Sequence, residues 1–377
     1  MSDFSSLLQQ LTNTANQVQT TNTNSKQKRD RSQSSNHISK KNHDTSLANT
    51  KRRRIQNKKL NNVPRDFNEL SIELSFLCIG AQKAGTTWLH KMLQYHEGIA
   101  LPKHQKELHF WDWHRSKGLG WYSRQFQEES EKDLLYGEIT PCYAVLSMND
   151  IHEIKLLFPK LKIIFFARDI LERTWSALLM ELYQNVQGMN PGEFIDNSKQ
   201  DTKTLHRFKK QQIMEEANPN NFDDDYFMDR MKHSTHLTRS DYATSLRNWL
   251  QVFPKESLLI IDYRHISSQP KDVLKQVTHH IITTNHSNQK SNKESQMNQQ
   301  FLNSLTDDQL SQRINVSLIK STLAESTTSC SNSKTANYQI RPSLERKMKQ
   351  FLQPIANEFN LLLKELGYSW SLDDYKE

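Results

Sequence analysis

The 377-residue sequence is poor in cysteine, and it has no long hydrophobic run. Its three cysteines, Cys78, Cys142 and Cys330, are too few and too far apart for a disulfide framework or a zinc site, so we expect buried or free thiols. No apolar stretch approaches the roughly 18 residues that cross a bilayer, and the N-terminus has no signal-peptide core. The sequence therefore predicts a soluble protein.

Apolar residues are also scarce, at 35% of the chain, which is enough for one sizeable core but leaves little for a second. The positive charge is concentrated at the start, because residues 1 to 65 hold 13 Lys and Arg against 3 Asp. This stretch is too polar to offset the entropy of ordering, so we expect disorder. Its basic cluster at residues 51 to 59 is either a nuclear address, a contact for nucleic acid or an acidic surface, or simply solvated.

A strand, a tight turn and a helix are expected in succession between Phe76 and His90. An apolar run stops at Gly80, the turn carries the cation Lys83, and a helical pattern opens at Thr86. The glycines let the main chain approach a ligand, while unpaired amides and the helix dipole favour an anion. We therefore expect this junction to hold a phosphate group.

The junction nearly matches the nucleotide-binding pattern G-x-x-x-x-G-K-[ST]. Gly80 and Gly85 have the required spacing, but the lysine stands two places before the second glycine. With this displaced cation, the segment resembles the 5'-phosphosulfate loop of sulfotransferases that use 3'-phosphoadenosine-5'-phosphosulfate (PAPS), particularly the heparan sulfate type. The resemblance implies that the donor is contacted by Lys83, Ala84, Gly85, Thr86, Thr87 and Trp88.

Residues 103 to 112 place two carboxylates, two imidazoles and two lysines beside an aromatic cluster, an arrangement that suits proton transfer in a partly dry pocket. The segment resembles the Lys-Glu-x-His-Phe-Phe segment of heparan sulfate 3-O-sulfotransferases. By that resemblance Glu107 takes the proton of the acceptor hydroxyl, and Lys106 and His109 are supporting cations or donors. The residues alone favour a surface carboxylate and an ordinary histidine.

A further apolar strand is predicted over residues 162 to 167, with Arg168 at its carboxyl end and a helix after it. Ser176 lies about two turns into that helix, near enough to Arg168 to share one anion. The string R-D-x-x-x-R-x-x-S resembles the second signature of the same family. The resemblance implies that Arg168 and Ser176 hold the 3'-phosphate of the nucleotide, whereas an arginine that ends a strand is often only an ion-pair partner.

The later regions are less informative. Residues 184 to 237 are polar and aperiodic, so we expect an insertion near the acceptor site, and residues 284 to 333 predict a mobile loop. Lys334 stands where relatives carry a basic loop over the nucleotide, which makes it a candidate donor ligand, although the glycines of that loop are missing. An apolar stripe over residues 344 to 366 predicts a long helix that Pro354 should kink or split.

Together these features predict a disordered basic tail at residues 1–65 and one α/β domain at residues 66–377. The domain is expected to be P-loop-like, with a mainly parallel central sheet flanked by helices. The resemblance implies PAPS as co-substrate, no metal, and an acceptor hydroxyl, by analogy that of a carbohydrate. A protein tyrosine or a small alcohol stays open as acceptor.

Two other function classes fit parts of the pattern. A P-loop nucleotide kinase or NTPase shares the strand-loop-helix logic, but the lysine is displaced and a clear Mg²⁺-holding aspartate is missing after a second strand. A non-catalytic nucleotide-binding protein would use the basic tail on nucleic acid or a membrane. By sequence we expect a cytoplasmic or nuclear protein, and by family analogy a Golgi one.

Overall fold

The computed structural model describes residues 64, 66–126, 134–186, 215–282, 296, 298–301, 303, 338–373 and 375. All of these lie in the second of the two units into which the chain divides, Asn62–Glu377. Lys334, Cys330, almost all of the predicted tail and most of the predicted 284–333 loop lie outside the described residues.

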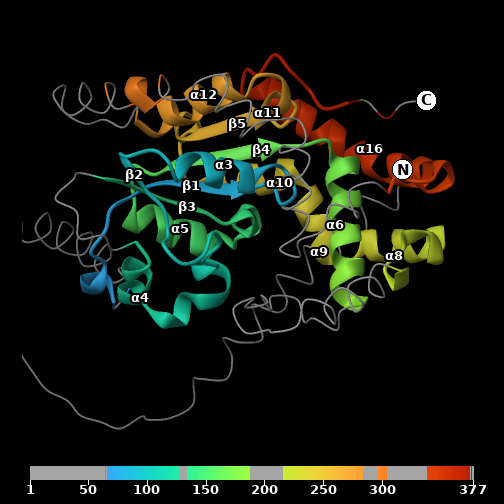
Figure 1. Cartoon of the computed structure of the whole chain (residues 1–377), viewed down its shortest axis with the longest axis horizontal. Helices are drawn as coiled ribbons and strands as arrows, with labels where there is room; N and C mark the ends of the chain where they lie inside the picture. The colour runs from blue at the N-terminus through green and yellow to red at the C-terminus, as the bar shows by residue number, and fades with distance from the viewer. Residues whose placement is uncertain are drawn as a thin grey trace, which may run out of the picture. The chain divides into compact units, whose positions relative to one another are not determined.

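A five-stranded parallel sheet forms the centre of the described structure (Figure 1). Its order is β2-β3-β1-β4-β5. The strands are β1 (Leu74–Gly80), β2 (Ile99–Ala100), β3 (Leu135–Ile139), β4 (Lys162–Ala167) and β5 (Leu258–Asp262). The strand segments expected from their apolar runs are confirmed, and so is the predicted α/β fold with a parallel central sheet.

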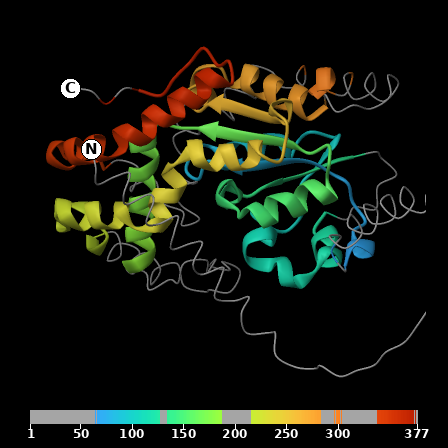
Figure 2. The ribbon, with the colours of Figure 1, turned by 180° about the vertical axis from the view of Figure 1, so that it is seen from behind.

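Helices cover both faces of this sheet. Figures 1 and 2 show α3 (Thr86–Leu93) on one face, and α5 (Met148–Leu157) and α10 (Tyr242–Leu250) on the other. The chain therefore leaves β1 toward one face and travels from β4 to β5 over the opposite face. In open parallel sheets such a change of side creates a crevice at the carboxyl ends of the strands involved, where ligands bind. Here that place is the carboxyl ends of β1 and β4.

The remaining elements connect and extend this framework. Helix α6 (Ile170–Val186) follows β4, α12 (Pro270–Ile282) packs against β4 and β5, and α16 (Pro342–Glu365) packs on α6, α8 and α10. The short elements are η1 (Phe67–Glu69), η2 (Phe110–His114), η3 (Arg115–Lys117), α4 (Leu119–Arg124), η4 (Pro141–Val145), η6 (Pro219–Asn221), α8 (Asp224–Lys232), α9 (Ser234–Ser240), η7 (Lys255–Ser257) and α11 (His265–Ser268). None of the helices in the described ranges is long and apolar enough to cross a membrane.

The core lies between the sheet and its helices. The central strands are apolar on both faces, as parallel strands covered on both sides require, and their fully buried side chains include Phe76, Leu77, Cys78, Ile79, Ile163, Ile164, Phe165 and Phe166. Leu89, Met92 and Leu93 of α3 are buried against this layer, as their spacing predicts. The loop between β1 and α3 is thus held by a rigid strand on one side and an anchored helix on the other.

Of the two outcomes predicted at Pro354, a kink or a split of the helix, the split is wrong. Helix α16 runs continuously from Pro342 to Glu365, with Pro354 inside it on the exposed face. A proline removes one main-chain hydrogen bond, but the carbonyl that loses its partner can bond water when it faces solvent. The opposite face is buried over the whole helix, through Leu344, Met348, Leu352, Ile355, Phe359, Leu362 and Leu363. This packing outweighs the local defect.

In the described second part of the predicted insertion at residues 184 to 237, α8 and α9 form although the sequence shows no clear period there. Asp223 caps α8, since its side chain accepts a hydrogen bond from the amide of Tyr226 at 2.8 Å. The apolar contacts are few and widely spaced: Phe227, Met231 and Leu237 are buried. Helices this short depend on capping and tertiary packing, so their sequence shows little periodicity.

Candidate active site

The loop after β1 has one fixed shape. The amide of Ala81 donates to the carbonyl of Phe166 in β4 at 3.0 Å, which ties the loop to the neighbouring strand. Gly85 has a φ of 82°, and a Cβ there would lie 2.4 Å from Cδ1 of Ile266. Because both the backbone angle and the space exclude a side chain, only glycine fits at this position.

Lys83 and Arg168, from the two predicted signatures, lie side by side. Arg168 donates from Nη1 to the carbonyl oxygen of Lys83 at 3.0 Å, and its guanidinium lies 4.8 Å above the ring of Tyr263. Lys83 is only 5% exposed, with Nζ 3.7 Å from Sδ of Met180. The carboxyl ends of β1 and β4 therefore bring two cations together at one edge of the sheet.

This cationic group is suited to a multiply charged anion. Burial and the nearby Arg168 guanidinium hold the pKa of Lys83 well below its usual range. Burial also lowers the pKa of Arg173, on α6, to about 10. Arg173 is fully buried, and within the described part of the chain its Nε and Nη1 have no hydrogen-bond partner, while Nη2 donates to Oγ of Ser240 at 2.7 Å. A bound anion would relieve this accumulated positive charge.

The segment with the candidate base contacts the loop through Lys106. The Nζ of Lys106 donates to Oγ1 of Thr86, the first residue of α3, at 3.2 Å, and it forms an ion pair with Glu107. The side chain of Glu107 is 27% exposed, and its Oε2 lies 3.5 Å from Nε2 of His109. Lys106, Glu107 and His109 are therefore brought together beside the loop.

Asp112 belongs to the same group, although the sequence reasoning assigned it no role. Its Oδ2 lies 2.8 Å from Nδ1 of the buried His109. The ring of Trp113 stacks on His109, with centroids 3.7 Å apart and planes 8° from parallel. The signal available in the sequence was the three-residue spacing of His109 and Asp112, which brings two side chains to one face of a helical turn.

Each charged side chain in this group stabilises the charge of its neighbour. Burial acts to raise the pKa of Glu107, but Lys106 and His109 outweigh it and lower that pKa to about 2. Burial acts to lower the pKa of His109, but Asp112 and Glu107 outweigh it and raise that pKa to about 9. The resting site is thus an alternating row of cation, carboxylate, imidazolium and carboxylate.

Glu138 anchors the segment that carries Glu107 and His109. It is fully buried, where desolvation raises its pKa, and it accepts hydrogen bonds of 2.7 Å from the hydroxyls of Tyr122, Thr140 and Tyr143. The hydroxyl of Thr140 in turn accepts a hydrogen bond from the amide of Leu108 at 3.2 Å, and the hydroxyl of Tyr143 accepts one from the amide of Phe110 at 2.8 Å. Glu138 therefore positions the backbone around His109.

The remaining described residues predicted to bind the sulfuryl donor are buried or half-buried. Ala84 and Trp88 are 0% and 1% exposed, Thr87 is half-buried, and Ser176 is 7% exposed on α6. The structure does not describe Lys334.

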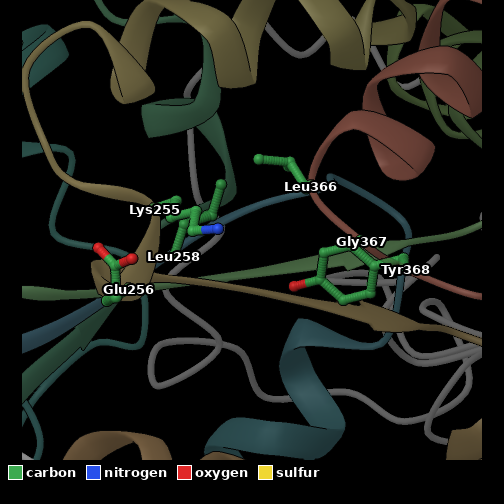
Figure 3. Close-up of a pocket in the computed structure, with 6 residues that line it drawn as sticks. All are labelled: Lys255, Glu256, Leu258, Leu366, Gly367 and Tyr368. Atoms are coloured by element: carbon green, nitrogen blue, oxygen red, sulfur yellow. The ribbon is translucent and has the colours of Figure 1, made fainter.

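A cavity of about 200 Å³ lies elsewhere (Figure 3). Its lining consists of Lys255, Glu256, Leu258, Leu366, Gly367 and Tyr368. Leu258 begins β5, whereas the candidate site follows the carboxyl ends of the parallel strands. None of the predicted site residues lines this cavity.

Comparison with known proteins places the chain among sulfotransferases. A family model described as "Sulfotransferase domain" matches residues 75–358. The "Membrane-associated sulfotransferase kil1" of Dictyostelium discoideum is 25% identical over 262 residues, which are 54% of this chain and 55% of that protein. The chain therefore matches about half the length of this relative.

Solved structures of sulfotransferases are also similar to it. One is a sulfotransferase from Alicyclobacillus acidocaldarius, at 15% identity and a TM-score of 0.44, covering 78% of this chain and 96% of that one. Another is the sulfotransferase domain from the curacin biosynthetic pathway, at 14% identity and a TM-score of 0.38, covering 80% of this chain and 99% of that one.

Proposed function

Because the chain belongs to the sulfotransferase domain family, we propose that it transfers a sulfuryl group from PAPS to a hydroxyl of a carbohydrate. One observation carries the proposal: Lys106 contacts both Thr86 of the anion-binding loop and the carboxylate Glu107. A group bound at the loop would then lie next to a base that can activate an acceptor.

The donor would occupy the crevice between β1 and β4. The loop amides, Lys83, Thr86 and Thr87 bind its 5'-phosphosulfate end at the start of α3. Arg168 and Ser176 hold the 3'-phosphate. The accumulation of buried positive charge on Lys83 and Arg173 supports an anionic ligand at this place.

In the proposed reaction the acceptor oxygen attacks the sulfur in line with the bond to the 5'-phosphate. A new oxygen–sulfur bond forms, the bond from sulfur to the bridging phosphate oxygen breaks, and Glu107 takes the hydroxyl proton. The products are a sulfate ester and adenosine 3',5'-bisphosphate. Lys83 and the loop amides stabilise the charge that grows on the departing phosphate, so positioning and electrostatics supply most of the acceleration.

Lys106 would control the strength of the base. A carboxylate with a pKa of about 2 is a weak base at neutral pH, and its ion pair with Lys106 is the main cause of that low value. When the donor binds, its sulfuryl oxygens compete with Glu107 for the same ammonium group. Moving Lys106 toward the donor raises the pKa of Glu107, so the base becomes effective only once the donor is in place.

A carbohydrate acceptor is supported by the residues around the base. The segment around Glu107 resembles that of enzymes that sulfate a sugar hydroxyl. The indole of Trp113, which covers His109, is 47% exposed and offers a flat apolar surface next to the base. Such surfaces pack against the apolar face of a sugar ring while its hydroxyls reach polar groups nearby.

The test is transfer of radiolabelled sulfate from PAPS to a panel of glycans, tyrosine peptides and small alcohols. We expect labelled glycan from the unaltered chain and a turnover lower by roughly 10²- to 10⁴-fold in Glu107→Gln. Glu97→Gln is the matched control, because Glu97 is an exposed carboxylate outside this group. Ordinary turnover in Glu107→Gln would remove the base assignment. Magnesium-dependent ATP hydrolysis without sulfate transfer would favour a nucleotide kinase or NTPase.

A further inference from the structure

Cys142 lies beside the His109–Asp112 pair, and the proposed reaction assigns it no role. His109 immediately precedes the π-helical turn η2 (Phe110–His114), Asp112 lies within that turn, and Cys142 comes from η4, which follows β3. One ligand atom from each of the three residues lies within 4.8 Å of the other two. Side chains 30 residues apart in sequence thus converge on one point.

The three potential metal-ligand atoms favour one class of metal ion. An imidazole nitrogen, a carboxylate oxygen and a thiolate sulfur are the ligands of zinc and zinc-like ions, whereas magnesium and calcium prefer oxygen alone. Zinc bond lengths of about 2.0–2.3 Å in tetrahedral geometry place neighbouring ligand atoms roughly 3.4–3.6 Å apart. The His109–Asp112 contact is 2.8 Å and all three ligand atoms lie within 4.8 Å of one another, so the group is compact enough to surround such an ion. Rotation of the side chains between neighbouring rotamers would therefore build the site.

The surroundings of Cys142 argue against a nucleophilic or redox role for its thiol. Cys142 is 8% exposed, and burial raises its pKa to about 11, although the guanidinium of Arg239 lies 3.4 Å from Sγ. Reactive thiols are accessible and have a lowered pKa. The carboxylates of Glu107 and Asp112 offset the positive charges of Lys106, His109 and Arg239 around the thiol, and a bound divalent cation would displace the protons of the imidazole and the thiol.

We propose that His109, Asp112 and Cys142 form a binding site for a zinc-like divalent cation, and that the bound cation blocks sulfuryl transfer. The ion separates His109 from Asp112, because it needs the ligand atoms that now contact each other at 2.8 Å. It also places a double positive charge beside Glu107 and, with three protein ligands, leaves one position of a tetrahedral ion open. The blocking step rests on the proposed function, while ion binding does not.

The binding test uses Co²⁺ as a spectroscopic probe on the full chain. We expect a thiolate-to-cobalt charge-transfer band and the intense visible bands of tetrahedral cobalt, both removed by addition of Zn²⁺. Cys142→Ala should lose the charge-transfer band, and Cys142→Ser, which keeps the volume of the side chain, should lose it too. Cys330→Ala, which removes a different thiol, should keep it. Absence of the band in the unaltered chain, or its persistence in Cys142→Ala, would overturn the site.

The second readout is the rate of sulfate transfer as Zn²⁺ is added. We expect inhibition of the unaltered chain and at least a tenfold higher inhibitory concentration for Cys142→Ala. Equal sensitivity of the two proteins would overturn the blocking step. The cobalt spectrum needs no turnover, so it remains decisive for ion binding even if the chain transfers no sulfate.

Discussion

The alternating charges of the candidate site can be tested by removing one of them. Asp112→Asn takes away the negative charge next to His109 and keeps an oxygen that can accept from Nδ1. In the unaltered chain Asp112 and Glu107 together overcome burial and raise the pKa of His109 from 6.5 to about 9. If the two carboxylates share this rise about equally, Asp112→Asn lowers the pKa by at least about one unit, worth about 1.4 kcal/mol.

The direction of the effect on stability follows from proton binding. Between pH 6.5 and about 9 the folded chain holds a proton on His109 that the unfolded chain releases. The stabilisation is therefore complete below pH 6.5 and is lost as pH rises through about 9. In Asp112→Asn the same loss is complete at a lower pH. At pH 8 the imidazole of Asp112→Asn is at least half neutral, which removes positive charge from beside Glu107, raises the pKa of that carboxylate and so makes transfer faster relative to pH 6.5.

The measurement is an NMR titration of the His109 ring, supported by unfolding free energies and transfer rates over the same pH range. Asp229→Asn is the control, since it makes the same charge change at an exposed position on α8. A pKa that stays near 9 in Asp112→Asn would refute the reasoning, and so would an equal shift in the control.

Two further substitutions test the supports of the site. Glu138→Gln should lower the free energy of unfolding by about 2–4 kcal/mol in denaturant titrations, because three buried hydroxyl donors lose a charged acceptor; an unchanged unfolding midpoint would contradict that anchoring role. Gly85→Ala should weaken donor binding at least tenfold in calorimetry, since its Cβ would meet Ile266 at 2.4 Å and its φ is 82°; unchanged affinity would show that the loop's shape does not matter.

The parts of the site that could be predicted are those that depend on local patterns of consecutive residues. The apolar run up to Gly80, the helical pattern from Thr86 and the strand before Arg168 each follow from local periodicity. Parallel strands end at one edge of a sheet, so the proximity of Lys83 and Arg168 also followed from the expected topology. The structure has Arg168 donating to the carbonyl of Lys83 at 3.0 Å.

The parts that were not predictable depend on how separate elements pack. Cys142 meets His109 and Asp112 only because η4 lies against η2, and no local pattern encodes that contact. Arg239 reaches Cys142 from α9, an element whose short, polar sequence shows no period. The split that Pro354 predicted does not occur for the opposite reason: a strong local rule was outweighed by the buried face of α16.

The central claim is that one nucleotide is held at two anionic ends, by the loop around Lys83 and by Arg168. Calorimetric binding of adenosine 3',5'-bisphosphate and of adenosine 5'-monophosphate tests it most directly, because the two ligands differ only in the 3'-phosphate. We predict at least tenfold tighter binding of the bisphosphate by the unaltered chain, and loss of that preference in Arg168→Ala. Equal affinity for the two nucleotides, or a preference that survives in Arg168→Ala, would contradict the account.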